Sequence, residues 1–368
     1  MSWPSGLNYS VRLIQRYRIE LVVMTAVSIL FAIGMWRVVA SDALQYPKIV
    51  EVFRGQATFD DVWAPFRNRV LVPFLASILP FDPKSSIQFV NLFFAFGTVI
   101  IFVRYLRSFR FNQENTLFGA MLLMCTVPYF AYGPQPLSEM GAMFFIVLSL
   151  YLTKKGTSLA FIMVVISLGI LCRETVFFVL PAILIISYRG KNNGSRWGYL
   201  AAILPFVTIL GIRFLISQAI ASGDGSSPIG YVWSIDPNYI QLNLGRLVNF
   251  VDPVSQGLSG GSFWLSFVPF APFALTRILA PHKQSEITKN ERGFLLTSGL
   301  FLFLLTIYCF VAAGIDGRNV WVLYPALIPL SMAEYANWSE IRVFRSIKIY
   351  LDKMLQYLAV GRGSKQTE

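Results

Sequence analysis

Two closely spaced arginines, Arg67 and Arg69, stand directly before a short apolar segment of the chain. At an i, i+2 spacing both side chains can face one phosphate group, because guanidinium forks pair with phosphate oxygens. The alternative is a pair of interfacial arginines whose long side chains reach from the membrane into water. The spacing therefore predicts either a phosphate site or a membrane-interface anchor.

A second pair of charges, Arg173 and Glu174, lies near the middle of the long apolar stretch Thr157–Ser187. Ionisable groups at membrane depth are costly, so they are candidates for a functional site. Arg173 would face an anionic lipid headgroup, with Glu174 orienting it; alternatively, the pair only stabilises a bend. Asp316 and Arg318 form a similar arrangement where the last apolar stretch begins, and the alternative there is an ordinary turn.

Carboxylates in the polar stretch after the first apolar segment are candidates for acid–base chemistry. Asp42 stands four residues before Tyr46, and a half-shielded carboxylate there can take a proton from an acceptor hydroxyl. The alternative is a polar residue at a helix end. Asp61, with Asp60 beside it, is the second candidate base.

Glu139 opens a later apolar stretch and is a candidate for a supporting role in the site. The alternative is an ordinary helix-start residue, because the helix dipole favours an acid in the first turn. The single histidine, His282, stands in a basic turn, and the three cysteines lie far apart within apolar segments. No metal site is predicted from these residues. A divalent cation remains an open possibility as a cofactor.

The elements that must position these residues are predicted to be membrane-spanning helices. Hydrophobic residues make up 55% of the 368-residue chain and charged residues only 14%, against about 25% charged in soluble domains. Lipid cannot satisfy free backbone groups, so the fold expected is an all-α polytopic membrane protein. We expect about ten crossings, including a short helical hairpin that bends at Arg173–Glu174. The apolar stretches are Ile19–Ala40, Ser86–Val103, Thr116–Tyr132, Leu137–Leu152, Thr157–Leu171, Thr175–Ser187, Trp197–Ile220, Ser262–Ala280, Gly293–Gly314 and Asn319–Asn337.

Charge gives these crossings an orientation. Most of the 31 lysines and arginines fall in alternate turns between apolar stretches, which places both termini in the cytoplasm of an integral membrane protein. The net charge of +12 is spread over these turns, so nucleic-acid binding is not expected. The transmembrane domain is predicted over 1–338, with outer loops at 41–69 and 221–261. Residues 339–368 read as an amphipathic tail on the anionic cytoplasmic leaflet.

Four places in the chain resemble the GT-C superfamily of membrane glycosyltransferases, which includes the protein mannosyltransferases. They are Asp42 with Tyr46, the stretch 65–73 (Pro-Phe-Arg-Asn-Arg-Val-Leu-Val-Pro), Cys172–Thr175 followed by Val179–Pro181, and Gly317–Arg318 leading into 322–329.

The resemblance implies a GT-C-like fold and an enzyme whose site faces outside. The enzyme would transfer a sugar from a polyprenyl-phosphate donor to a lipid, glycan or protein acceptor, in contact with membrane lipids. It further implies that Asp42 is the base and that Arg67, Arg69, Arg173 and Arg318 hold the donor phosphate. The family often has paired acids near the first span, whereas Asp42 stands alone, so Asp61 remains the alternative base.

Two other functions fit a polytopic membrane chain. A transporter or lipid-sugar flippase would place charged or broken segments near the midplane in both halves. A non-catalytic membrane subunit of a polysaccharide-assembly complex would need no outer cavity.

Overall fold

The computed structural model describes residues 18–34, 41–63, 66–126, 128–189, 196–219, 237–248, 259–267, 270–279, 287–312 and 320–338. All regular secondary structure in these ranges is helical, as the sequence predicts. Asp316, Arg318 and the predicted amphipathic tail (339–368) lie outside the described residues, as does most of the predicted outer loop 221–261.

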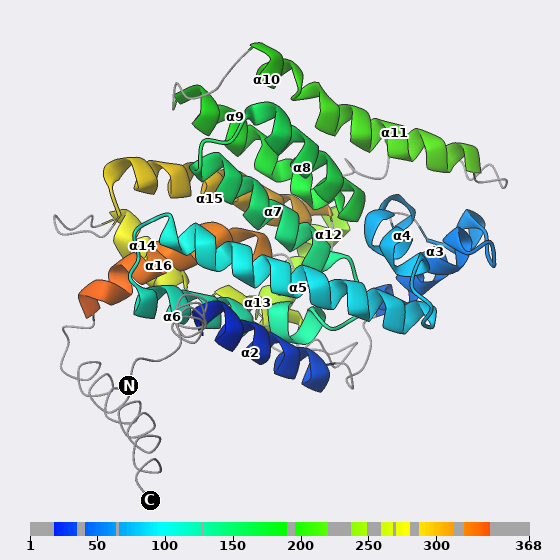
Figure 1. The fold of residues 1–368 in the computed structure, drawn as a ribbon, viewed down its shortest axis with the longest axis horizontal. Helices are drawn as coiled ribbons and strands as arrows, with labels where there is room; N and C mark the ends of the chain where they lie inside the picture. Colours follow the sequence, from blue (N-terminus) through cyan, green and yellow to red (C-terminus); the bar gives the residue numbers. More distant parts are fainter. Residues whose placement is uncertain are drawn as a thin grey trace, which may run out of the picture.

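Three helices form the centre of the molecule: α5 (Pro83–Arg107), α7 (Glu139–Lys154) and α8 (Leu159–Cys172). α5 packs along α7, and α7 packs along α8 (Figure 1). Asp82 caps the N-terminus of α5, because its Oδ1 accepts a hydrogen bond of 3.0 Å from the Ser85 backbone N–H. α7 is buried along most of its length, so its first residue, Glu139, is carried into the interior.

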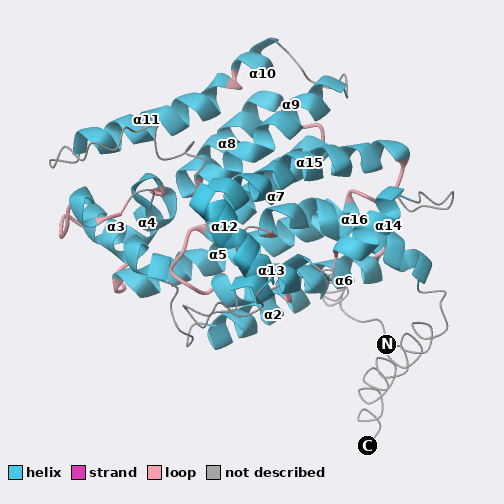
Figure 2. Cartoon of the chain, turned by 180° about the vertical axis from the view of Figure 1, so that it is seen from behind, coloured by secondary structure: helices cyan, strands magenta, loops and turns pink. Residues whose placement is uncertain are grey.

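The other helices surround this centre (Figures 1 and 2). They are α2 (Arg18–Gly34), α3 (Gln45–Phe53), α4 (Leu71–Ser77), α6 (Gln113–Met124), α9 (Val179–Arg189), α10 (Arg196–Leu200), α11 (Ile203–Ala219), α12 (Pro237–Val248), α13 (Ser259–Phe267), α14 (Ala271–Leu279), α15 (Lys289–Ala312) and α16 (Tyr324–Trp338). Short helical turns are η1 (Ser41–Leu44), η2 (Phe59–Asp61), η3 (Phe66–Asn68), η4 (Pro128–Tyr132), η5 (Glu174–Phe178) and η7 (Trp321–Leu323). α11 lies at the edge of the bundle beside α8.

Three of the described helices are long and apolar enough to cross a membrane: Pro83–Arg107, Trp197–Ala219 and Lys289–Val311. Met24–Gly34 and Leu159–Cys172 are apolar but shorter. A helix rises about 1.5 Å per residue, so these two are shorter than the ~30 Å hydrocarbon core. The helical content and the three long apolar helices indicate a helical membrane protein.

Three predicted segments differ in the structure. The stretch 262–280, predicted as one crossing, falls on two separate nine-residue helices, α13 and α14, the first of which begins at Ser259. Pro269 falls between them and cannot donate the backbone hydrogen bond that a continuous helix needs. The predicted loop 221–261 contains α12, and the polar stretch 41–69 contains α3, whose apolar side chains at i, i+3 and i+4 (Tyr46, Ile49, Val50) are buried.

The break predicted at Arg173–Glu174 is present. α8 ends at Cys172, Arg173 is extended (φ −163°, ψ 133°), and the chain turns through η5 into α9. One long helix is thereby avoided, and the two charged residues lie where the backbone changes direction. Residues of α9 pack against α7 and α15.

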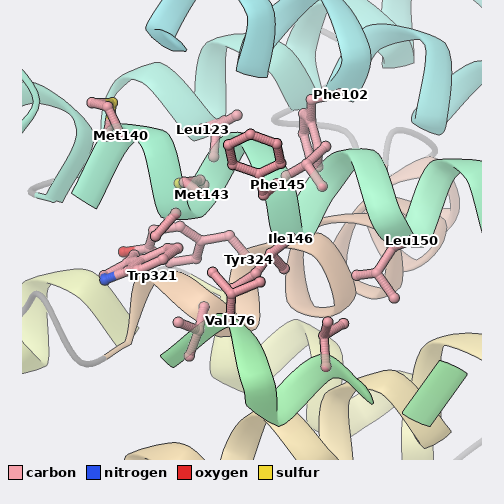
Figure 3. Close-up of a cluster of buried hydrophobic side chains, with 14 of the residues drawn as sticks. Phe102, Leu123, Met140, Met143, Phe145, Ile146, Leu150, Val176, Trp321 and Tyr324 are labelled. Atoms are coloured by element: carbon pink, nitrogen blue, oxygen red, sulfur yellow. The ribbon is translucent and has the colours of Figure 1, made fainter. Parts of the chain in front are cut away.

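An apolar core holds this turn against the rest of the bundle (Figure 3). Phe102 of α5, Leu123 of α6 and Ile146 of α7 are buried in it, together with Val176 of η5 and Trp321 of η7. Close packing of this kind restricts small displacements, because each side chain contacts many neighbours. The core therefore fixes the η5 turn relative to α7.

A single arginine ties α3 to the end of α4. Arg54 Nη2 donates hydrogen bonds to the carbonyl oxygens of Leu79 (2.7 Å) and Phe81 (2.9 Å), and Nε donates to that of Ser77 (3.3 Å). Ser77 ends α4, and Leu79 and Phe81 lie between α4 and α5, where backbone carbonyls lack helical partners. Arg54 thus holds the end of α3 against the connection between α4 and α5.

Candidate functional site

A paired ionic contact joins two segments that are far apart in the sequence. Arg69 directly follows η3, and Glu174 begins η5. Nε and Nη2 of Arg69 donate to Oε2 and Oε1 of Glu174 at 3.0 and 2.7 Å. Such a two-pronged pair is among the strongest side-chain contacts, and it sets the orientation of both groups. It holds the segment before α4 against the turn after α8.

The remaining donor group of Arg69 binds a tyrosine. Nη1 of Arg69 donates to the hydroxyl oxygen of Tyr46 at 2.9 Å, and this hydroxyl lies 3.0 Å from Oγ of Ser138. Tyr46 is fully buried, and the guanidinium carbon of Arg69 lies 5.1 Å from the centre of the Phe66 ring. Every nitrogen of Arg69 is therefore held in one geometry by described partners.

A second ion pair lies at the start of α7. Arg173, in the extended turn after α8, pairs with Oε1 of Glu139. Glu139 is only 4% exposed, and it is the neighbour of Ser138, which contacts Tyr46. The two ion pairs are thus joined through Tyr46 and Ser138 and through the peptide that links Arg173 to Glu174.

A third arginine, Arg213 of α11, approaches the carboxylate of Glu174. Arg213 is 7% exposed and interacts electrostatically with Glu174 and with Tyr308 of α15. We call Tyr46, Arg69, Ser138, Glu139, Arg173, Glu174 and Arg213 the ion-pair cluster. Within this cluster of described residues, three arginines share two carboxylates.

The protonation of Glu174 follows from its neighbours. Burial alone would raise the pKa of this carboxyl group, but Arg69, bonded to it, and nearby Arg173 lower the pKa from 4.5 to about 2. Glu174 is therefore a carboxylate at neutral pH. A group with so low a pKa is a weak base, so Glu174 suits the positioning of arginines better than proton transfer.

An apolar groove lies beside the cluster. It has a volume of about 400 Å³ and lies between α3, η2 and α4 on one side and α8 and α11 on the other. Phe74 and Leu215 line it and are 48% and 64% exposed, so the groove reaches the surface of the molecule. We call it the α4–α11 groove. The lining residues Val70, Leu171 and Ile212 lie within two positions of Arg69, Arg173 and Arg213.

The predicted site residues divide into two groups. Tyr46, Arg69, Glu139, Arg173 and Glu174 come together in the cluster. Arg67 is buried, but its Nε donates to the carbonyl oxygen of Val62 in its own loop. Asp42 lies in η1, one turn before Tyr46. Asp316 and Arg318 are not among the described residues.

Asp61 and its neighbour Asp60 lie in the short turn η2. Oδ2 of Asp61 accepts hydrogen bonds from the backbone N–H (3.2 Å) and the hydroxyl (3.1 Å) of Thr58, which closes a capping box. Asp61 is exposed, and its backbone oxygen accepts a hydrogen bond of 3.1 Å from Lys48. These contacts give Asp61 a part in stabilising the turn.

Two members of the cluster, Arg213 and Ser138, were not predicted as site residues. Arg213 is the single charged residue of the apolar helix α11, and an isolated charge at membrane depth is a signal for function. Ser138 carries no such signal, because its role depends on where α3 and α7 meet. Among the described residues, no group of three His, Cys, Asp or Glu side chains could hold a metal ion.

No known protein family and no curated protein matches the chain.

Proposed function

We propose that this chain is a membrane glycosyltransferase that moves a sugar from a polyprenyl-phosphate donor to an acceptor hydroxyl outside the cytoplasm. The observation that carries the proposal is the ion-pair cluster, with its three oriented arginines, beside the apolar α4–α11 groove. Ligand sites typically combine an apolar wall with a few well-placed polar groups. Here the groove takes the prenyl chain and the arginines take the phosphate.

The topology is part of the same proposal. About ten crossings with both termini in the cytoplasm place the segment 41–69, the start of α7 and the Arg173–Glu174 turn on the outer side. All parts of the ion-pair cluster then lie at one membrane face. A donor held in lipid reaches this face from the side, through the exposed groove between α4 and α11.

The arginines would act on the leaving group. In transfer, the bond between the anomeric carbon and the phosphate oxygen breaks, and its electron pair remains on the phosphate. Arg69, Arg173 and Arg213 stabilise this developing charge, because they are already oriented before the reaction begins. Arg318 remains a predicted fourth phosphate ligand.

The acceptor would be activated by a carboxylate. The acceptor oxygen forms the new bond to the anomeric carbon, and its proton passes to the carboxylate. We assign this role to Asp42, which lies one turn before Tyr46, whose hydroxyl contacts Arg69. Asp61 is the weaker candidate, since its carboxylate closes the capping box of η2. Direct displacement by one base inverts the anomeric configuration.

A lipid-phosphate flippase is the second candidate, and the exposed groove favours it. A slot open to the bilayer beside buried arginines also suits a lipid phosphate that only moves between leaflets. A liposome assay separates the two functions. Movement of the donor between leaflets without loss of its sugar would support transport and contradict the transferase.

The direct test measures transfer by the purified full chain in detergent. Radiolabelled mannose or arabinose on undecaprenyl phosphate is offered as donor, with membrane lipid and glycan extracts as acceptors. We expect transfer by the unmodified chain. Arg69→Gln and Arg173→Gln should lower the rate about 10- to 100-fold, the effect of one lost hydrogen bond to a charged group.

Lys48→Gln is the matched control, because it removes a positive charge near η2 but outside the cluster. It should leave transfer within about twofold of the unmodified rate. The proposal is wrong if no donor is consumed, or if Arg69→Gln and Lys48→Gln transfer equally well.

A further inference from the structure

A second apolar groove lies between α14, α15 and α16. It has a volume of about 450 Å³, within the ~300–1,000 Å³ range of ligand sites. Small residues, including Ala271, Gly299 and Ala326, line its wall, and the lining residue Leu300 is 59% exposed. We call it the α14–α16 groove. Its lining contains no charged side chain, so it suits a hydrocarbon chain.

One end of this groove is marked by an arginine. Arg292 lies one helical turn before the lining residues Leu295 and Leu296 on α15. Its Nη2 donates a hydrogen bond of 2.5 Å to the carbonyl oxygen of Ile278, which also lines the groove. Nε of Arg292 is buried and has no hydrogen-bond partner within the described part of the chain. The guanidinium group therefore has donor capacity left for a ligand.

The neighbouring carboxylate does not neutralise this charge. Glu291 accepts a hydrogen bond of 2.9 Å from Nζ of Lys154, and its other oxygen accepts from the backbone N–H and hydroxyl of Thr288. The ion pairs found in the described ranges do not include Arg292. No described acid therefore forms an ion pair with Arg292, and its positive charge is available to an anion.

The length of the groove matches one leaflet of a bilayer. From Arg292 to the lining residue Phe303 is eleven residues along α15, or about 16 Å at 1.5 Å per residue. Half of a ~30 Å hydrocarbon core is about 15 Å. A lipid with its phosphate at Arg292 would therefore extend its chain to about the bilayer centre beside Phe303.

We propose that the α14–α16 groove binds one acyl chain of an anionic glycerophospholipid whose phosphate contacts Arg292. Hydrocarbon fits the apolar wall, and the phosphate supplies the acceptor oxygens that the guanidinium group lacks. The site is separate from the ion-pair cluster, which meets α15 at Tyr308, about 24 Å along the helix from Arg292. It does not depend on the glycosyltransferase proposal.

The test measures lipid binding to the purified full chain by native mass spectrometry. Phosphatidylglycerol and phosphatidylcholine with the same acyl chains are titrated separately. We expect tighter binding of phosphatidylglycerol, and Arg292→Gln should weaken it about tenfold, as expected for one lost hydrogen bond to a charged group. Lys289→Gln, which removes an exposed positive charge at the same helix end, should weaken it by about threefold or less.

A second pair of variants tests the groove itself. Leu300→Gln puts a polar group into the α14–α16 groove, whereas Ile307→Gln puts one at an exposed position of α15 outside the residues that line it. We expect only Leu300→Gln to weaken phosphatidylglycerol binding. Equal binding of the two lipids, equal effects of Leu300→Gln and Ile307→Gln, or displacement of the lipid by inorganic phosphate alone would each overturn the proposal.

Discussion

The α4–α11 and α14–α16 grooves are alike in size and apolar lining, but they end in different charges. The first lies beside three arginines that contact or approach two carboxylates and a tyrosine. The second ends at Arg292, whose hydrogen-bond partner among the described residues is one backbone carbonyl oxygen, that of Ile278. A guanidinium group fixed on several sides presents its donors in one direction, whereas a group with one partner can turn. The ion-pair cluster therefore offers arginines of fixed orientation, whereas the α14–α16 groove offers mainly a positive charge.

The difference also shows in how each arginine was placed by the fold. Arg69 is positioned by residues from α3, α7 and η5, which come together only when the bundle is complete. Arg292 is positioned by α15 and the end of α14. Loss of one partner should therefore cost more at the ion-pair cluster than at the α14–α16 groove.

The largest expected effect is on stability. Arg69→Ala leaves the half-buried Glu174, and Glu174→Ala leaves the buried Arg69, without its paired partner, which costs about 3–5 kcal/mol. The double variant should cost clearly less than the two single changes added together, because neither member of the Arg69–Glu174 pair is then left without the other. Arg292→Ala, which loses one hydrogen bond, should cost about 1 kcal/mol. The measurement is the free energy of unfolding in mixed detergent micelles; simple additivity of the two changes would contradict a coupled pair.

A smaller effect is expected from pH. The pKa of Glu174 is depressed to about 2, so its contribution to stability is complete above the ordinary value of 4.5 and disappears as the pH falls towards 2. Lowering the pH from about 5 to 2 should therefore remove about 3 kcal/mol in the unmodified chain. Glu174→Gln should lack this part of the pH dependence, and Arg292→Gln should keep it. Identical pH curves for the unmodified chain and Glu174→Gln would show that the pair is not ionic.

The sequence predicted the features of the molecule that depend on a local pattern of residues. Helical structure follows from the apolar stretches, and the break after α8 follows from the cost of placing Arg173 and Glu174 inside one helix. Four residues of the cluster, Arg69, Glu139, Arg173 and Glu174, could be chosen because charges in an apolar chain are rare. Their pairing could not be predicted: Arg69 bonds to Glu174, 105 positions away, rather than to a nearby acid.

Other features had no local signal. Ser138 is an ordinary helix-start residue until α3 brings Tyr46 against it. The division into α13 and α14 was hidden by hydropathy, which averages over a proline such as the one at position 269 in the sequence. Both grooves are spaces between helices, so their existence depends on the packing of segments that no pattern relates. These features depend on contacts between segments that are distant in the sequence, and residue type alone does not indicate such contacts.

The smallest and sharpest test exchanges arginine for lysine at both grooves. Lysine keeps the charge but loses the planar fork, so it cannot repeat the two hydrogen bonds from Arg69 to Glu174 together with the third to Tyr46. Arg69→Lys should weaken binding of undecaprenyl phosphate about tenfold, whereas Arg292→Lys should change phosphatidylglycerol binding by about threefold or less. Both affinities are measured by titration of the same preparation in native mass spectrometry. If the two substitutions have equal effects, the arginines act only as charges, and the geometric distinction between the grooves is wrong.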